Sequence, residues 1–468
     1  MALIDKLANI FRVPDLRRRI LFTLGLLAVY RLGAHIPTPG INADLLQQFF
    51  EQNRGTMFGF IDLFSGGQLR RLTVFALGIM PYITSSIILQ LLTVVYEPLA
   101  KLQKEGELGR KKITQWTRYL TVVLGALQSL GIAVTLQRQT SAGTPFVTDP
   151  GMGFILMTVL TLTTGTAFIM WLGEQITERG IGNGMSLLIF AGIVVGLPRG
   201  IADLWTKARD AAWGAFTVPA LILLLIVMVG VVAFIVFVER SERRIPVQYA
   251  KRVVGRKIMG GQSTHLPLRV NAGGVMPVIF ASSILTFPQT LGFAFRENRY
   301  FGPVLQALGW GEPLYTLLYA LGIIFFAYFY VSIIFNPNEV ADNMRKYGGF
   351  VPGIRPGKRT ADHINDILTR ITLVGAGYLI LISLIPEWMI TGIHLHHLPS
   401  WLGGNLFERL PGWILNGLNV TFYFGGTSLL IVVGVAMDTV NQIEAQLIMR
   451  HYDGFTPRSG RIRGRRTW

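Results

Sequence analysis

Residues 78–89 read GIMPYITSSIIL, and a second stretch, GVMPVIFASSIL, repeats this pattern at residues 274–285. Seven positions coincide in register, including Pro81 with Pro277. Both stretches lie in apolar runs of membrane length, where proline is a poor choice because it removes a backbone donor and crowds the preceding turn. Interrupted apolar segments at matching places in two halves of a chain are typical of the working site of a membrane transport protein. Chance similarity between two apolar helices is the alternative.

The composition of the chain indicates a membrane protein. Its 468 residues are 51% hydrophobic and only 15% charged, whereas soluble proteins carry about 25% charged residues. Long uncharged runs alternate with short charged ones, as expected of a chain that crosses a bilayer several times. The chain has no cysteine, which excludes disulfides, thiolate catalysis and cysteine-bound metals.

The apolar runs predict ten transmembrane helices, because backbone groups in the bilayer must be hydrogen-bonded within the segment. The fifth run is short and follows RGIGNG at residues 179–184, so an irregular start is expected there. The ten predicted spans are residues 20–36, 74–96, 119–137, 154–173, 184–198, 216–238, 273–295, 313–335, 371–393 and 413–437.

The Lys and Arg residues predict the orientation of the chain, which has a formal net charge of +17. The basic segments all fall on one side of the membrane if ten spans alternate, whereas one opposite loop holds only Arg138. The positive-inside rule then places both termini in the cytoplasm. These basic segments are residues 1–19, 101–118, the loops at about 239–270 and 336–370, and the tail 438–468.

Each half of the chain contains five predicted spans, and five is odd, so the halves have opposite topology. The N-terminal half covers residues 20–198 and the C-terminal half residues 216–437. Each proline-containing stretch lies in the second helix of its half, which predicts an inverted repeat with a pseudo-twofold axis in the membrane plane.

The first 19 residues are predicted to form an amphipathic helix on the cytoplasmic surface. Leu3, Leu7 and Phe11 share one face at helical spacing, with Lys6 nearby. The arginines before Leu21 also fit the basic region of a cleavable signal peptide. An uncleaved first span is preferred, because a multi-span chain needs it to establish topology.

The spans lack the residues that many transporters need. Almost no ionisable side chain lies at mid-depth, whereas ion-coupled carriers keep one there and charge-selective channels use charged rings. A pore in this bundle would therefore be lined by apolar and small polar groups. The nearest sequence to a phosphate-binding loop ends at Lys358 and has Pro352 and Arg359 at required Gly and Ser/Thr positions. We therefore expect no nucleotide hydrolysis and no enzyme activity, and a docked partner would supply any driving force.

The first outer connection, MFGFIDLFSGGQLRR at residues 57–71, is apolar but too short to span a bilayer. Short apolar segments of this kind are often re-entrant. The segment is either a movable plug beside a pore or a packed extracellular cap, and the sequence favours neither.

Six motifs together give the chain a specific resemblance to the SecY family, the pore-forming subunits of the bacterial protein-translocation channel. The resemblance covers nearly the whole length. The motifs are DLFSGG at 62–67, GIMPYI at 78–83, RGIGNG at 179–184, QSTHLPL at 262–268, FVPGIRPG at 350–357 and GGTSLLI at 425–431.

The resemblance implies an all-α polytopic fold, with ten helices in two inverted five-helix halves around an hourglass pore. It implies a pore ring rich in isoleucine, in which Met185 replaces the usual isoleucine with a softer side chain. The alternative for each ring residue is ordinary core packing. The ring residues would be Ile83, Ile87, Met185, Ile189, Ile279 and Ile431.

A plug at about 57–72 and a lateral gate at the second, third, seventh and eighth spans are also implied. We expect Gln90 and the Ser and Thr hydroxyls of the second span to hydrogen-bond with Ser282 and Ser283 across the closed gate. Each such bond contributes about 0.6 kcal/mol, which an apolar signal sequence can outcompete. The plug residues would be Phe60, Ile61, Asp62, Leu63, Phe64, Ser65, Gly66 and Gly67. The gate residues would be Pro81, Ser86, Gln90, Pro277, Ser282, Ser283 and Phe287.

In the SecY family the two large cytoplasmic loops receive the ribosome or the SecA motor. The resemblance places these contacts at Arg243, Arg244, Lys251, Arg252 and Arg355. Arginine binds the phosphates of ribosomal RNA, and an acidic motor surface would be attracted by the same field. The alternative is that these charges only establish topology.

Further implied partners are small SecE-like and SecG-like membrane subunits, signal peptides, nascent chains and the lipid bilayer. No cofactor or metal site is expected; His394, His396 and His397 fit solvated loop residues better than metal ligands. The predicted function is passage of unfolded polypeptide across the plasma (inner) membrane, with lateral release of transmembrane segments. The alternatives are an inverted-repeat secondary transporter for a neutral small solute and a membrane scaffold without a pore.

Overall fold

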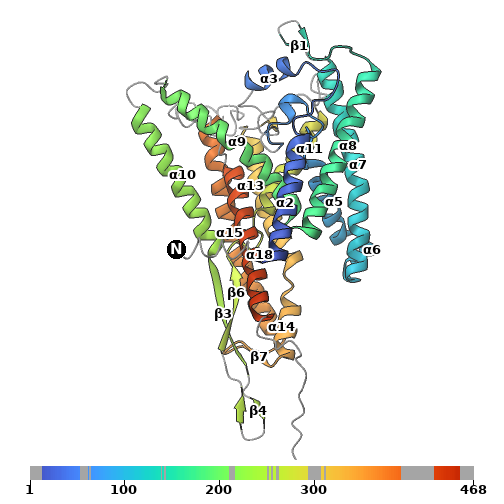
Figure 1. Cartoon of the computed structure of the whole chain (residues 1–468). Helices are drawn as coiled ribbons and strands as arrows, with labels where there is room; N and C mark the ends of the chain where they lie inside the picture. The colour runs from blue at the N-terminus through green and yellow to red at the C-terminus, as the bar shows by residue number, and fades with distance from the viewer. Residues whose placement is uncertain are drawn as a thin grey trace, which may run out of the picture.

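A computed structural model of the chain shows long helices lying side by side, with β3 and β6 projecting beyond one end of the bundle (Figure 1). The structure describes residues 13–52, 62, 65–138, 140–141, 144–209, 217–249, 252–254, 257–259, 263–292, 307–309, 312–391 and 426–453. Most of the predicted helix at 1–19, the distal part of the basic tail and the three outer-loop histidines lie outside these ranges.

Six of the described helices are long and apolar enough to cross a membrane, and the bent pair α5–α6 would make a seventh. The helical polytopic fold is therefore confirmed, whereas ten spans in two inverted halves stay a prediction. The helices are α2 (Pro14–Gly33), α3 (Ala43–Gln52), η1 (Leu69–Arg71), α5 (Met80–Val95), α6 (Glu97–Lys104), α7 (Glu107–Arg138), α8 (Met152–Arg179), α9 (Gly184–Arg209), α10 (Thr217–Arg240), α11 (Met276–Gly292), α13 (Pro313–Ile334), α14 (Pro337–Lys346), α15 (Lys358–Thr391) and α18 (Gly426–Asp453).

The two prolines of the repeated motif begin helices rather than interrupt them. Pro81 is the second residue of α5, and Pro277 is the second residue of α11. Proline is tolerated in the first helical turn, where its missing N–H would have no intrahelical acceptor. The prediction of helices broken at these prolines is therefore wrong, and a turn precedes each helix instead.

The turns before α5 and α11 have the same backbone geometry. Gly78 and Gly274 both have φ +57°. The N–H of Gly78 donates to the carbonyl of Phe75 at 2.8 Å, and the N–H of Gly274 donates to that of Asn271 at 3.3 Å. Glycine suits both positions because other residues rarely adopt positive φ. The sequence repeat is thus also a structural repeat at this turn.

The two basic loops, at about 239–270 and 336–370, contain β-structure that the all-α prediction missed. Strand β3 (Glu242–Tyr249) pairs antiparallel with β6 (Ser263–Arg269) and, at its end, with β7 (Gly349–Phe350). Alternate residues of β3 turn inward, so Ile245 and Val247 are buried while their neighbours are exposed. The shorter strands are β1 (Thr140–Ser141), β2 (Thr144–Pro145), β4 (Arg252–Val254) and β5 (Lys257–Met259).

The sheet β6–β3–β7 joins the two basic loops into one unit, because β7 belongs to the second loop. Ile245 and Leu268 of the sheet pack with Val351, and with Ile364 and Leu368 of α15. This small core fixes the loops to the N-terminal end of α15.

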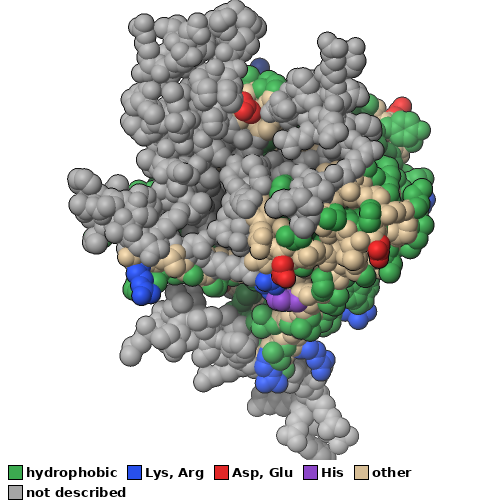
Figure 2. Space-filling view, turned by 90° about the horizontal axis from the view of Figure 1, so that it is seen from above, with side chains coloured by type: hydrophobic (Ala, Val, Ile, Leu, Met, Phe, Trp, Pro, Cys, Tyr) green, Lys and Arg blue, Asp and Glu red, His purple; other side chains and the backbone are tan. Residues whose placement is uncertain are grey.

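The largest apolar core lies where α5, α8, α9, α11, α13, α15 and α18 meet. Many large apolar side chains also remain exposed on the outer faces of the bundle, such as Leu225 and Val229 on α10 and Leu317 and Leu321 on α13. Hydrophobic side chains cover much of the outer flank of the described part (Figure 2). Such a surface fits lipid, since soluble proteins rarely expose large apolar patches.

Candidate functional site

A cavity of about 440 Å³, here called the vestibule, opens between α5, α7, α8, α9, α11 and α13. Four predicted ring residues line it: Ile83, Met185, Ile189 and Ile279. Its charged lining residues are Arg118, Glu174 and Glu178. The vestibule therefore combines an apolar part with a wetter part that carries charge.

The five predicted ring isoleucines are buried in one apolar cluster, to which α5, α9, α11 and α18 contribute. Met185 packs against this cluster. Its sulfur occupies the space beside Gly173, where an added Cβ would lie 2.4 Å from Sδ. A flexible thioether can adapt to such a gap. The structure brings these side chains together, and their role as a pore seal is a proposal.

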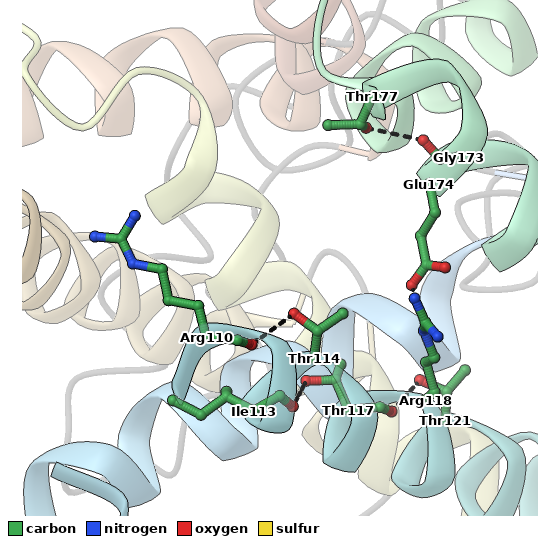
Figure 3. A network of polar contacts seen from close by, with 9 residues as sticks. All are labelled: Arg110, Ile113, Thr114, Thr117, Arg118, Thr121, Gly173, Glu174 and Thr177. Carbon is green, nitrogen blue, oxygen red and sulfur yellow. Dashed lines mark hydrogen bonds and ion pairs between the residues drawn. The ribbon is translucent and has the colours of Figure 1, made fainter. Parts of the chain in front are cut away.

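An ion pair joins α7 to α8 at the vestibule wall (Figure 3). Arg118 Nε donates to Glu174 Oε1 at 2.8 Å. The Arg118 side chain is 47% exposed, and partly exposed pairs of this kind contribute about 0.2–1 kcal/mol. Nearby, Thr177 donates to the carbonyl of Gly173 at 2.8 Å and accepts the N–H of Gly184 at 2.9 Å. These contacts fix the start of α9 against α8.

Sequence reasoning missed the contact between Arg118 and Glu174. The two residues are 56 positions apart. The sequence analysis assigns Arg118 only to the basic segment 101–118, which predicts the orientation of the chain. A carboxylate near the end of an apolar run was the only signal of a nearby cation.

The described part of the predicted plug, Asp62 and residues 65–72, is packed inside the protein. The backbone N–H of Arg70 donates to Asp62 Oδ1 at 3.1 Å, and Arg70 Nε lies 3.8 Å from Asp62 Oδ2. Burial raises the pKa of Asp62, and the charge of Arg70 opposes that rise. The remaining predicted plug residues, Phe60, Ile61, Leu63 and Phe64, lie outside the described part of the chain.

Gly66 brings this segment, here called the plug stem, against α9. Gly66 and Gly67 have φ +70° and +79°. An added Cβ on Gly66 would lie 2.8 Å from the backbone of Gly192 in α9. On the other side, Gln68 donates to the hydroxyl of Tyr30 at 2.7 Å. The plug stem is therefore held between α2 and α9 at backbone distance.

The predicted hydrogen bonds across the gate are wrong for Gln90 and Ser282. Gln90 Nε2 donates to Ser86 Oγ of its own helix at 3.2 Å, and Ser282 donates to the carbonyl of Ile279 at 2.9 Å. Hydroxyl and amide groups on helices readily bond within the same helix, which competes with partners on a neighbour. Ser283 does reach across, with Oγ 3.9 Å from Sδ of Met80.

The contact between Ser283 and Met80 lies beside an apolar cavity of about 60 Å³, which Phe287 also lines. Sulfur is only a weak acceptor, so this contact between α5 and α11 is a weak one. Pro277 and Pro81 remain in their predicted positions at the starts of these two helices.

Three of the four predicted partner-binding arginines lie on the sheet β6–β3–β7, here called the basic sheet, or in the turn that follows β7. Arg243 and Arg244 are exposed on β3, and Arg355 is exposed in the turn before α15. Arg252 is on β4, whereas Lys251 lies outside the described residues. Because β3 and β7 pair, the two loops form one continuous basic surface.

Comparisons with known proteins identify the family. The family model described as SecY matches residues 73–440. The chain belongs to the SecY family. Protein translocase subunit SecY of Vibrio cholerae serotype O1 is 49% identical over 447 residues, covering 94% of each chain. Its counterpart in Escherichia coli strain K12 is 49% identical over 442 residues, covering 94% of this chain and 93% of the relative.

Solved structures share the SecY-family fold. A protein-conducting channel superposes with a TM-score of 0.61 at 15% identity, covering 94% of each chain. A second structure superposes with a TM-score of 0.60 at 16% identity, again covering 94% of each chain. It is a SecY protein whose plug domain stabilises the closed state and maintains a membrane seal. The channel of a canine ribosome complex from the endoplasmic reticulum gives 0.57 at 15% identity with the same coverage. These likenesses confirm the fold of this SecY-family chain.

Proposed function

We propose that the chain is the central channel subunit of a protein translocase, through which unfolded polypeptide crosses the plasma membrane. Membership of the SecY family establishes the role of a translocase subunit. The observation that carries the proposed passage is the vestibule, whose apolar lining comes from both halves of the chain through Ile83, Ile189 and Ile279. An apolar constriction excludes water when closed and contacts any threaded chain without selecting its charge.

In the resting state, the plug stem and the pore ring are proposed to close the channel together. The stem lies against α9, which also carries Ile189. The contact of Ser283 with Met80 between α5 and α11 is weak, so an apolar segment can separate these helices there by burying its own surface. Each buried methylene contributes about 0.8 kcal/mol, which exceeds one interhelical hydrogen bond of about 0.6 kcal/mol. We propose that this seam is the lateral gate.

The basic sheet is the proposed docking surface for a cytoplasmic partner. Two solved channels of the same fold are bound to ribosomes, and the exposed Arg243, Arg244 and Arg355 suit the phosphates of ribosomal RNA. A SecA motor is the other proposed occupant. Small SecE-like and SecG-like subunits are proposed to complete the complex, with both termini of this chain in the cytoplasm.

A flux assay tests the proposed function against the small-solute transporter. The purified complex in lipid vesicles is expected to move an unfolded secretory polypeptide inward only when its motor or a ribosome is present. A neutral sugar or amino acid should not accumulate. Solute uptake without a cytoplasmic partner, together with no polypeptide transfer, would support the transporter instead.

Replacing Ile279 with Asn is expected to weaken the seal, because a polar side chain lets water enter a constriction that closes by excluding it. We expect the ion current through the resting channel to rise on the order of tenfold, while polypeptide transfer continues. Single-channel recording in planar bilayers measures this current. Ile279→Val keeps the apolar surface and is the control. Equal resting currents in the two variants would show that Ile279 is not part of the pore ring.

A further inference from the structure

Asn271 connects the end of α10 to the turn before α11, the proposed gate helix. Its side-chain nitrogen Nδ2 donates to Glu239 Oε1 at 2.7 Å and to the carbonyl of Gly274 at 3.0 Å. Asn271 is 5% exposed. One buried amide thus links the end of α10 with the turn from which α11 begins.

The position of this amide along the chain places it at the root of the sheet. Glu239 lies three residues before β3 begins, and Asn271 lies two residues after β6 ends. At this root the N–H of Val270, just after β6, donates to the carbonyl of Ser241, just before β3, at 3.0 Å. A displacement of the sheet therefore reaches Glu239 and Asn271 directly, as it also reaches α15 through the packing of Ile245 and Leu268 and α18 through the ion pair of Arg269 with Asp438.

The matching turn in the first half has no such polar connection. Its residue at the position of Asn271 is Phe75, since both accept the N–H of the glycine three residues later. Phe75 stacks on Tyr30 and Phe168, with ring centroids 5.9 Å and 6.0 Å apart. The repeat thus has an apolar anchor before α5 and a hydrogen-bonded connection before α11.

Two ends of the turn carrying Asn271 pack closely on neighbouring helices, whereas an added Cβ on Gly274 would meet nothing within 4 Å. An added Cβ on Gly375 of α15 would lie 2.7 Å from the carbonyl oxygen of Val270, and one on Gly434 of α18 would lie 2.8 Å from Val275. Interiors packed this closely transmit displacement rather than dissipate it.

We infer that Asn271 is a positioning residue that couples partner docking on the basic sheet to movement of gate helix α11. The inference rests on the proposed docking surface and gate. Hydrogen bonds from Nδ2 make the sheet root and the start of α11 move together, while α5 stays anchored by its aromatic stack. Gate opening would then begin in the second half of the repeat.

The test uses the full chain with its companion subunits in lipid vesicles and purified ribosomes as the probe. Because the chain has no native cysteine, Met80→Cys and Ser283→Cys report on the gate by their disulfide yield. Ribosomes are expected to lower this yield in the parent. In Asn271→Leu, which keeps side-chain size but removes the donor, the ribosome-induced change should fall at least about fivefold, the lower end of typical allosteric couplings.

Three further variants separate coupling from folding. Asn271→Asp keeps the shape but lacks the donor, so it should lose the response like Asn271→Leu. Glu239→Gln still offers an acceptor oxygen and should keep the response. Ser241→Ala removes a bond at the same root that runs back to Phe237 of α10, at 2.7 Å, and should also keep it. Ribosome affinity, measured by co-flotation, should stay within about twofold of the parent in all four, because Arg243 and Arg355 are untouched.

The outcomes are distinguishable. An unchanged ribosome response in Asn271→Leu and Asn271→Asp, with normal ribosome binding, overturns the coupling and leaves the proposed channel intact. Loss of the response in Ser241→Ala overturns it as well, because any disturbance of the root would then suffice. Ribosomes that neither bind nor alter the parent's disulfide yield overturn the docking proposal and the coupling with it.

Discussion

Gly66→Ala is expected to unseal the resting channel. The new Cβ would lie 2.8 Å from the backbone of Gly192, so α9 and the plug stem could not keep their present distance. The backbone at φ +70° adds strain, since a left-handed conformation costs a residue with a side chain about 1–2 kcal/mol. The plug stem should therefore move away from α9. A free-energy change of about 1.4 kcal/mol alters the ratio of packed to displaced plug stem tenfold, so the resting ion current should rise by at least about tenfold.

Conductance of the complex in planar bilayers measures this leak. Gly106→Ala is the matched control, because Gly106 also has a positive φ of +79° but has no neighbour within 4 Å of an added Cβ. It imposes similar strain far from the plug stem. A resting current as low in Gly66→Ala as in Gly106→Ala would show that the stem is a packed cap with no part in the seal.

Arg70→Leu is expected to be the most destabilising single change in the plug stem. The side chains of Arg70 and Asp62 are only 10% and 12% exposed. Removing one partner of a buried ion pair typically costs about 3–5 kcal/mol, because the other charge stays buried without compensation. The thermal unfolding temperature in detergent should fall clearly. Asp62→Asn combined with Arg70→Leu should recover most of the loss, since no buried charge remains.

The same variant should become sensitive to pH. Burial raises the pKa of Asp62, and without Arg70 nothing charged opposes that rise. A carboxyl whose folded pKa is raised binds its proton more tightly in the folded state, so its stability is lost as pH rises through the folded pKa. Acidification from neutral pH towards about 4, near the unfolded pKa, should therefore restore Arg70→Leu. A deficit that stays constant with pH would contradict the assignment of an ionised, buried Asp62.

Local sequence patterns predicted the parts of the fold that depend on nearby residues. Apolar runs predicted the helices α7, α8 and α15. The expectation of an irregular start to the fifth span was also correct, because α9 begins only at Gly184 after a turn. In each case the deciding interactions lie within a few residues.

The sequence could not predict contacts between distant residues. The ion pair of Arg118 and Glu174 joins two helices whose relative rotation no single-sequence pattern specifies. The basic sheet was missed because β3 alternates only two buried residues, Ile245 and Val247, among charged ones. The gate prediction failed at Gln90 because the nearest partner, Ser86, lies one turn away on the same helix.

The sharp bend between α5 and α6 restricts how the seam beside Met80 can part. The two helices meet at 105° across Tyr96. Glu97 and Lys101 of α6 have side chains 79% and 72% exposed, and drawing such charges to mid-bilayer costs roughly 2.5–3.5 kcal/mol each. The bend therefore opposes sliding of α5 along its own axis, because such sliding would draw the charged residues of α6 into the bilayer. Only a sideways swing, pivoting near the headgroups, remains open to this helix.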